Sequence, residues 1–223
     1  MKESADYFAL RELSDMYSQY LFRKKRGRHK MEFHFYAMLS RMKYIERWAL
    51  MKNSETENIS EHSMEVAMLT HSLAIIGNVR LGKTLNVERA ALIGLFHDCT
   101  EIITGDMPTP IKYYSEDIIK AFKEVEEKAA MKLLDMLPKD MQEYYMGLFY
   151  KVEEDAYLWK LEKAADKLSA LIKCIKEENA GNQEFILAKK TLEETLEKME
   201  LEEVQIFMKD FLPSYYKTLD ELH

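Results

Sequence analysis

Turn-forming residues are scarce in this chain, and their scarcity limits the folds that it can adopt. Only 7 glycines and 4 prolines occur in 223 residues, so uninterrupted segments must be long. Apolar residues recur at helical spacing, as at Phe35, Met38, Leu39, Met42 and Ile45, and no long stretch alternates with the period of a strand. Long segments with few breakers predict an all-α protein that folds as a single-domain helical bundle.

The same reading predicts where the later helices begin and end. Asn86 is a good N-cap, with Glu88 in the first turn of the helix that follows. The sequence "GNVRLGKT" at 77–84 should end the preceding helix. The sequence "TGDMPTP" at 104–110 should be a loop, because residues before proline avoid helical angles. After the helix over Phe35–Ile45, helices are expected at 60–76, 87–101, 115–136, 139–150, 154–178, 182–199 and 201–219.

Composition and charge indicate an ordinary globular protein with an N-terminal appendage. Hydrophobic residues make up 47% and charged residues 32% of the chain. Six of the eight residues at 23–30 are Lys or Arg, although the whole chain carries a net charge of −7. A basic run of this kind is either a nucleic-acid patch or a solvated linker; on an acidic protein we favour the linker and expect no nucleic-acid partner. We therefore predict an extension over 1–30 and one domain over 31–223.

The cysteines and the apolar runs bear on location. Cys99 and Cys174 are far apart and form no C-x-x-C pattern, as is usual in a reducing compartment. No apolar run approaches the roughly 20 residues of a membrane span, and the N-terminus lacks the order of a signal peptide. We expect a cytoplasmic protein with no membrane partner.

The stretch "ALIGLFHDCTEIITGDMPTP" at 91–110 places ionisable residues directly after an apolar segment. His97 and Asp98 are adjacent, and Glu101 and Asp106 follow within eight residues. Such groups are costly behind a core-like segment unless they are paired or hold an ion. Either the helix reaches solvent at this point, or the residues form a metal site.

Helical periodicity points two histidines toward the core. His97 stacks over Ala90 and Ile93, and His62 heads an apolar face one turn inside its helix. Either could be a core histidine, but two inward imidazoles beside Asp98 are the ligand mix of a divalent transition metal. The apolar face of the His62 helix consists of Val66, Leu69, Leu73 and Ile76.

Three blocks in order resemble a known family. "SEHSMEVAMLTHSLA", "LFHDCTEIITGDMPTPIK" and "KAADKLSALIK" resemble the H…HD…D signature of HD-domain metal-dependent phosphohydrolases. The similarity is closer still to their bacterial 5′-deoxynucleotidase branch, the YfbR-like proteins, whose first helix carries an Arg-Trp pair, matched here by Arg47–Trp48. The similarity runs from about residue 32 to the C-terminus and leaves residues 1–30 outside the family pattern.

The resemblance implies a fold of the HD-domain type, a metal centre and an assembly. The ligands would be His62, His97, Asp98 and Asp166, although periodicity alone predicts that Asp166 is solvated. The site would hold one divalent transition metal, with Co²⁺ or Mn²⁺ favoured and Zn²⁺ also acceptable to this ligand set. The ion would lower the pKa of a water that attacks phosphorus. The family also implies a homodimer.

The resemblance also implies a substrate and residue roles. Deoxyribonucleoside 5′-monophosphates would be hydrolysed to deoxynucleoside and phosphate. Arg47 would hold the phosphate through two prongs, and Glu101 would transfer a proton. Trp48 would pack against the nucleotide or belong to the core, and Asp106 would bind the sugar or form a turn; Lys112 is better explained as a solvated lysine. The sugar pocket would be lined by Asp106, Met107, Pro108 and Thr109.

Two other functions are compatible with the pattern. A two-metal phosphodiesterase would need more inward histidines, and His71 faces away from His62 on the same helix. A non-catalytic HD module with a nucleic-acid-binding arm would not need the intact ligand set together with Glu101. We therefore favour a one-metal phosphatase.

Overall fold

The computed structural model describes residues 32–112 and 114–222, and in these ranges the prediction of an all-α protein is confirmed. The chain divides into two compact units, 1–34 and 35–223, and all the elements described below belong to the second. The expected extension over 1–30, with its basic run, lies outside the described residues. The elements are α2 (Phe35–Leu39), η1 (Met42–Tyr44), α3 (Ile59–Leu81), α4 (Val87–Phe96), α5 (Glu101–Thr104), α6 (Thr109–Lys112), α7 (Glu116–Leu134), α8 (Lys139–Phe149), η2 (Glu153–Asp155), α9 (Ala156–Asn179), η3 (Gln183–Phe185), α10 (Ile186–Lys198), α11 (Glu202–Asp210), η4 (Leu212–Tyr216) and η5 (Leu219–Glu221).

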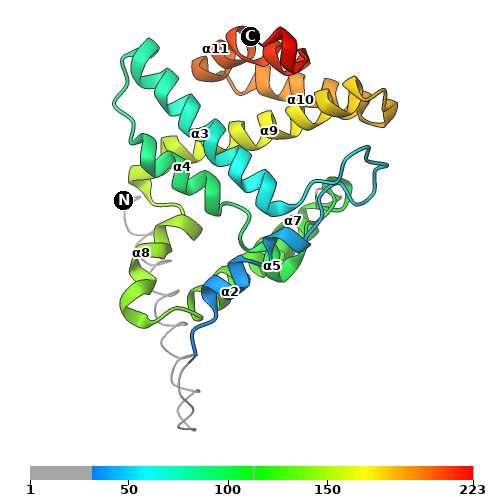
Figure 1. Cartoon of the computed structure of the whole chain (residues 1–223). Helices are drawn as coiled ribbons and strands as arrows, with labels where there is room; N and C mark the ends of the chain where they lie inside the picture. The colour runs from blue at the N-terminus through cyan, green and yellow to red at the C-terminus, as the bar shows by residue number, and fades with distance from the viewer. Residues whose placement is uncertain (1–31, 113, 223) are drawn as a thin grey trace. The chain divides into compact units, whose positions relative to one another are not determined.

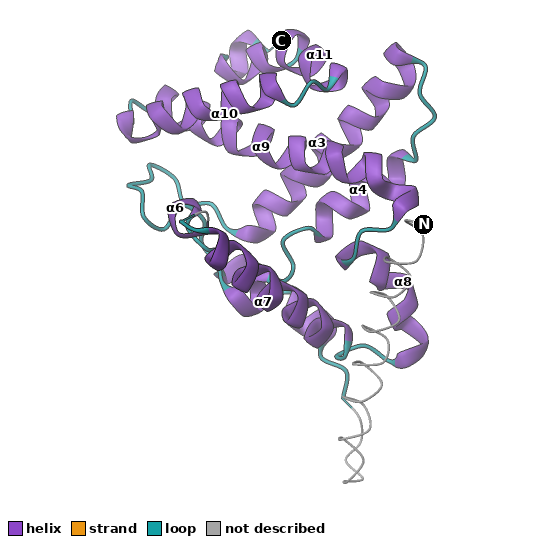
Figure 2. Ribbon diagram, turned by 180° about the vertical axis from the view of Figure 1, so that it is seen from behind, coloured by secondary structure: helices purple, strands orange, loops and turns teal. Residues whose placement is uncertain are grey.

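Helices α3, α4 and α9 pack against one another and build the larger hydrophobic core. Gly94 of α4 lies so close to α3 that an added Cβ would be 2.8 Å from Cα of Ala67 and 2.9 Å from the carbonyl oxygen of Val66. The two backbones therefore touch, and the C-terminal end of α4 is held beside α3. Helices α10 and α11 lie on one side of this group, and α2 and α7 lie on the other (Figures 1 and 2).

A second, smaller core joins α2, η1, the start of α3 and the end of α7. It contains Phe35, Ile59, Cys99 and Leu133, all at most 1% exposed. Ile59 belongs to this cluster, whereas Val66, two turns further along α3, belongs to the larger one. The segment of α3 between the two cores carries His62.

The structure corrects the expected end of α3. The helix does not break at Gly77 but continues to Leu81, and it ends at Gly82, whose φ of +68° is left-handed. Gly77 is needed for packing instead, because an added Cβ would lie 2.8 Å from the Glu203 carboxylate. The cap at the start of the next helix is confirmed, since the Asn86 side chain accepts from the Arg89 amide.

The structure also shortens the helix that carries the His-Asp pair. Helix α4 ends at Phe96, and 97–100 form a turn before α5 begins at Glu101. The predicted loop is correct for 105–108, but Thr109 and Pro110 begin α6, because proline is tolerated in the first turn of a helix. The last predicted helix is divided into α11, η4, which contains Pro213 in its first turn, and η5.

The predicted helix over Phe35–Ile45 is also shorter than expected. Helix α2 ends at Leu39, η1 ends at Tyr44, and Ile45 is extended. Arg47 and Trp48 therefore lie in a loop rather than on a helix, and Trp48 has a left-handed φ of +60°.

Two expectations about the chain as a whole can be compared with the structure. Cys99 and Cys174 are both free, which agrees with the expected lack of a disulfide framework, and both are buried. None of the described helices is long and apolar enough to cross a membrane.

Candidate active site

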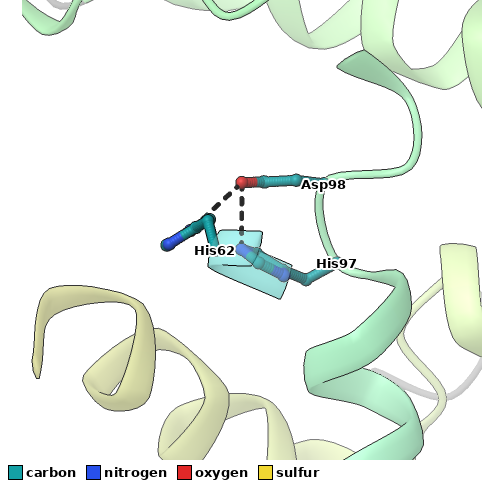
Figure 3. A group of neighbouring side chains, drawn as sticks. All are labelled: His62, His97 and Asp98. Carbon is teal, nitrogen blue, oxygen red and sulfur yellow. Dashed lines mark ion pairs between the residues drawn. The ribbon is translucent and has the colours of Figure 1, made fainter. Parts of the chain in front are cut away.

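His62, His97 and Asp98 meet where α3 passes the end of α4 (Figure 3). Asp98 Oδ2 lies 3.0 Å from His97 Nε2 and 3.4 Å from His62 Nε2. His62 is completely buried, and the two imidazole rings approach edge to face with 5.1 Å between their centroids. One ligand atom from each residue lies within 4.8 Å of the other two. The inward orientation of both histidines is therefore confirmed.

Asp166 reaches the same place from α9. Its Oδ1 atom lies 3.2 Å from His62 Nε2, and its side chain is 36% exposed, so periodicity correctly predicted its contact with solvent but missed its contact with the cluster. Helix α9 packs against α3 and α4 on one side and α10 on another. Asp166 lies off the apolar stripe of α9, on a partly exposed part of the helix that still reaches His62 of α3.

The histidine donor atoms fit a metal. His97 Nδ1 lies 2.7 Å from the carbonyl oxygen of Gly94, to which it can only donate, so in the neutral ring the lone pair is on Nε2. Both Nε2 atoms are buried and, among the described residues, have no partner in hydrogen-bond geometry. A buried, unpaired nitrogen is costly. Nitrogen lone pairs that converge with carboxylate oxygens form a donor set that suits a divalent transition metal.

The charges at this site suit a bound cation. Burial alone would lower the pKa of His97, but the Asp98 carboxylate raises it to about 10. Burial would raise the pKa of Asp166, whereas its close contact with His62 lowers it to about 2. The pKa of Asp98 is held well below its usual range, mainly by His97 against the effect of burial. Both carboxylates stay ionised, and without a metal a proton on His97 offsets part of their charge.

Glu101 is the carboxyl group suited to carry a proton. It is the first residue of α5, it is 7% exposed, and its buried Oε2 has no hydrogen-bond partner among the described residues. Burial raises the pKa of Glu101 to about 9, with further contributions from Asp98 and Asp106. Its carboxyl group therefore holds a proton at neutral pH in the metal-free protein.

Arg47 points toward the metal cluster instead of toward solvent. Its Nη1 pairs with Glu57 Oε2 at 3.1 Å, and its Nη2 lies 3.9 Å from Asp166 Oδ1. The indole nitrogen of Trp48 donates to the same Glu57 oxygen at 2.9 Å, and its ring packs on Phe185. Glu57 thus fixes both members of the Arg-Trp pair.

The loop that follows Trp48 is anchored to the end of α9 by residues that the sequence analysis missed. The Glu177 carboxylate accepts from the Ser54 amide at 2.8 Å and from Asn182 Nδ2 at 2.7 Å, and it also pairs with Lys173. Asn182 Nδ2 also donates to the carbonyl oxygen of Lys52 at 2.8 Å. Burial would raise the pKa of Glu177, but its partners lower it to about 2. The only signal in the sequence is an i,i+4 Lys-Glu pair, which is usually a surface feature.

Asp106 lies in the loop after α5 and is half-buried. Burial raises its pKa, while Arg47 and a backbone hydrogen bond from Trp48 lower it, so it lies within electrostatic reach of the Arg-Trp pair. Met107 and Pro108 follow it in the same loop, and Thr109 begins α6. Lys112 is not simply solvated, because its ammonium group pairs with Glu126 at 3.0 Å.

Glu162 is a second acidic residue that the sequence analysis missed. It is 5% exposed and lies one turn before Asp166 on α9. Burial raises its pKa to about 7; Asp166 and Asp98 add to this shift, and His97 opposes it. Because Glu162 lies four residues before Asp166 on the same helix, the sequence could have placed the two carboxyl groups on one face.

Comparisons with known proteins point to one family. A family model described as 5′-deoxynucleotidase YfbR-like matches residues 34–215. The 5′-deoxynucleotidase YfbR of an Escherichia coli strain is 47% identical over 192 residues, which cover 85% of this chain and 95% of that protein. A 5′-deoxynucleotidase of an Enterobacter species is 46% identical over 191 residues, with the same coverage of both chains.

Solved structures share the fold. An HD-domain phosphohydrolase from Listeria innocua superposes with a TM-score of 0.71 at 24% identity, covering 82% of this chain and 88% of that one. A cyanophage S-2L HD phosphohydrolase, described as bound to dA and one catalytic Zn²⁺ ion, gives a TM-score of 0.56 at 21% identity and covers 82% and 96%. At these identities the likeness shows the HD-domain fold.

Proposed function

The chain belongs to the YfbR-like 5′-deoxynucleotidase family of HD-domain phosphohydrolases, and on this premise we propose that it hydrolyses deoxyribonucleoside 5′-monophosphates to deoxynucleosides and phosphate. It is a phosphoric monoester hydrolase. The observation that carries the proposal is the position of Arg47, whose guanidinium lies 3.9 Å from Asp166 at the edge of the His62, His97 and Asp98 cluster. A phosphate held by Arg47 would lie next to the metal donors.

We assign one divalent transition metal to His62, His97, Asp98 and Asp166. A bound ion supplies Lewis acidity toward a phosphate oxygen and lowers the pKa of water. Mixed nitrogen and oxygen donors suit Co²⁺ or Mn²⁺, and Zn²⁺ as well. The described residues contain one group of three convergent His, Asp or Glu ligands, which supports one metal rather than the two of a phosphodiesterase.

The remaining residues bind the substrate and move the proton. Arg47 orients the phosphate through two parallel N–H donors. Water attacks phosphorus as the P–O5′ bond breaks, Glu101 gives its proton to the leaving O5′ oxygen, and the resulting carboxylate takes up the proton that the attacking water loses as phosphate forms. Asp106 accepts from the sugar 3′-hydroxyl and crowds the 2′ position, which favours deoxyribose; Trp48, Met107, Pro108 and Thr109 complete the nucleotide pocket.

The proposal extends to domain organisation and location. The hydrolase domain covers 31–223, supported by the family match that begins at residue 34, and residues 1–30 are an extension. The free, buried Cys99 and Cys174 support a reducing compartment and hence the cytoplasm.

We also propose that the enzyme is a homodimer. Apolar side chains lie exposed along one face of α3, where Met64 is 60%, Met68 55% and Val79 76% exposed, and an apolar face of this kind suits a second copy of the chain. We expect Met68→Glu to shift the protein toward the monomer in sedimentation. The control is Leu187→Glu, which changes an exposed leucine of α10. This substitution should leave the dimer intact. A wild-type protein that sediments as a monomer would contradict the proposal.

Arg47→Lys tests the phosphate site. A point charge cannot reproduce the two-pronged contact, and losing a charge-assisted contact of ~1.5–3 kcal/mol lowers kcat/KM for deoxyadenosine 5′-monophosphate by roughly 10–150-fold. Melting should change little because the charge is kept. Wild-type enzyme should hydrolyse the 3′-monophosphate poorly from the outset.

The control for this substitution is Arg41→Lys, an exposed arginine in the preceding segment. It should behave as wild type in both assays. Unchanged kinetics in Arg47→Lys would remove Arg47 from the phosphate site.

A further inference from the structure

Behind His62, on the side away from the metal cluster, a chain of polar groups runs toward the surface. His62 Nδ1 lies 3.1 Å from Ser169 Oγ, and Ser169 Oγ lies 2.6 Å from Glu65 Oε2. Lys176 Nζ pairs with the other Glu65 oxygen at 3.2 Å. Ser169 is completely buried, whereas Lys176 is largely exposed. Neither Ser169 nor Glu65 has a part in the phosphatase chemistry described above.

The chemistry of these groups fixes the direction of each hydrogen bond. An ionised carboxylate can only accept, so the Ser169 hydroxyl donates to Glu65, and the short distance is typical of a charge-assisted bond. The serine proton is then committed, and its lone pairs remain to accept from His62 Nδ1–H. Glu57 Oε1 lies 3.8 Å from the same nitrogen, which is too far for a hydrogen bond.

This direction sets the tautomer of His62. With the proton on Nδ1, the lone pair is on Nε2, which faces Asp98 and Asp166 at 3.4 and 3.2 Å. The reverse tautomer would direct N–H into the cluster and could not bind a metal. His97 obtains the same tautomer from the backbone carbonyl of Gly94, which no substitution removes. The two histidines therefore differ, because only the tautomer of His62 depends on side chains.

We propose that Ser169 and Glu65 are positioning residues that hold His62 in the Nδ1–H tautomer and thereby set the affinity of the site for its metal. The inference rests on the proposed function, because it takes the metal site as given. Ser169 acts directly on His62, and Glu65 acts through Ser169 by occupying its proton. Without Glu65, the hydroxyl is free to rotate and to donate to Nδ1, which favours the wrong tautomer.

The test is metal affinity, measured by competition with a chelator for Zn²⁺ and for Co²⁺. Groups that orient a metal-ligating histidine typically contribute about 10–100-fold to metal affinity, and we expect a loss in this range for Ser169→Ala. Glu65→Ala should lose less, in the same direction. Because Glu65 lies near the surface, its removal should leave the fold intact even if Ser169→Ala does not fold.

Ser63→Ala is the matched control. Ser63 is the neighbour of His62 on α3, it is 1% exposed, and its hydroxyl has no hydrogen-bond partner among the described residues. Like Ser169→Ala, the Ser63→Ala substitution removes a buried serine hydroxyl, but this hydroxyl does not contact His62 Nδ1. Metal affinity should therefore be unchanged. A nitrogen-15 spectrum of the zinc-loaded protein adds a direct readout, since the His62 Nδ1–H signal should be present in wild type and Ser63→Ala and lost or exchange-broadened in Ser169→Ala.

The outcomes separate the two proposals. Wild-type affinity in both Ser169→Ala and Glu65→Ala, with metal bound normally by wild type, would overturn the positioning role and leave the phosphatase intact. A wild-type protein that binds neither metal would overturn the metal site and the positioning role together. An equal loss of affinity in Ser63→Ala would attribute the effect to packing and also overturn the positioning role.

Discussion

Phosphate release from deoxyadenosine 5′-monophosphate should stop when the divalent ion is removed by a chelator and should return when Co²⁺ or Mn²⁺ is added. The reason is the donor set: two buried imidazole nitrogens without hydrogen-bond partners face two ionised carboxylates. Their affinities should follow the preference of mixed nitrogen and oxygen ligands, so Mg²⁺, which prefers all-oxygen sites, should restore activity poorly. Colorimetric phosphate release across a series of added metals measures this effect.

Metal binding should also release a proton. In the metal-free protein the Asp98 carboxylate outweighs burial and raises the pKa of His97 to about 10, so the imidazole is protonated at neutral pH and must lose its proton to bind a metal. The apparent affinity should therefore rise with pH up to about this value, and calorimetry in buffers of different ionisation enthalpy should detect the proton.

His71→Ala, which removes the half-buried histidine elsewhere on α3, is the control for both metal predictions and should keep metal and activity. Full activity in the metal-free protein would refute the assignment.

Glu101→Gln should retain the metal and lose turnover by a factor on the order of 10²–10⁴, the usual scale for a general acid. The amide has the same shape but cannot transfer a proton. Metal content and kcat are measured on the same preparation, with Glu124→Gln, an exposed carboxylate on α7, as the control. If metal and activity are lost together, Glu101 is a ligand or a structural support instead.

The same substitution should stabilise the metal-free protein at alkaline pH. Burial, with the repulsion of Asp98 and Asp106, raises the pKa of Glu101 from 4.5 to about 9. Between these values the folded chain holds a proton that the unfolded chain has lost, so the folded state loses stability as the pH rises. Glutamine does not titrate, so the gain in melting temperature should be larger at pH 8 than at pH 5. Opposite effects on turnover and stability are expected of a catalytic group and not of a structural one.

The sequence by itself determined the features that depend on local periodicity. The helical class follows from the scarcity of breakers, and the inward direction of His62 follows from the apolar residues one, two and three turns along the same helix. His97 follows in the same way from Ala90 and Ile93. These inferences succeed because residues three, four and seven apart share a helix face whatever the rest of the chain does. Gly77 is the exception, because in a sequence a glycine that permits close packing cannot be distinguished from one that ends a helix.

The tertiary structure alone decided the features that depend on distant segments. Asp166 lies off the apolar stripe of its helix, and it joins the cluster only because α9 packs against α3, which places His62 Nε2 3.2 Å from its carboxylate. The loop that carries Arg47 is held by Glu177, 123 residues away from Ser54, and the His62 tautomer is fixed by Ser169, 107 residues along the chain. A hydrogen bond between such distant residues leaves no periodic trace in either segment, because its geometry exists only after the helices have packed.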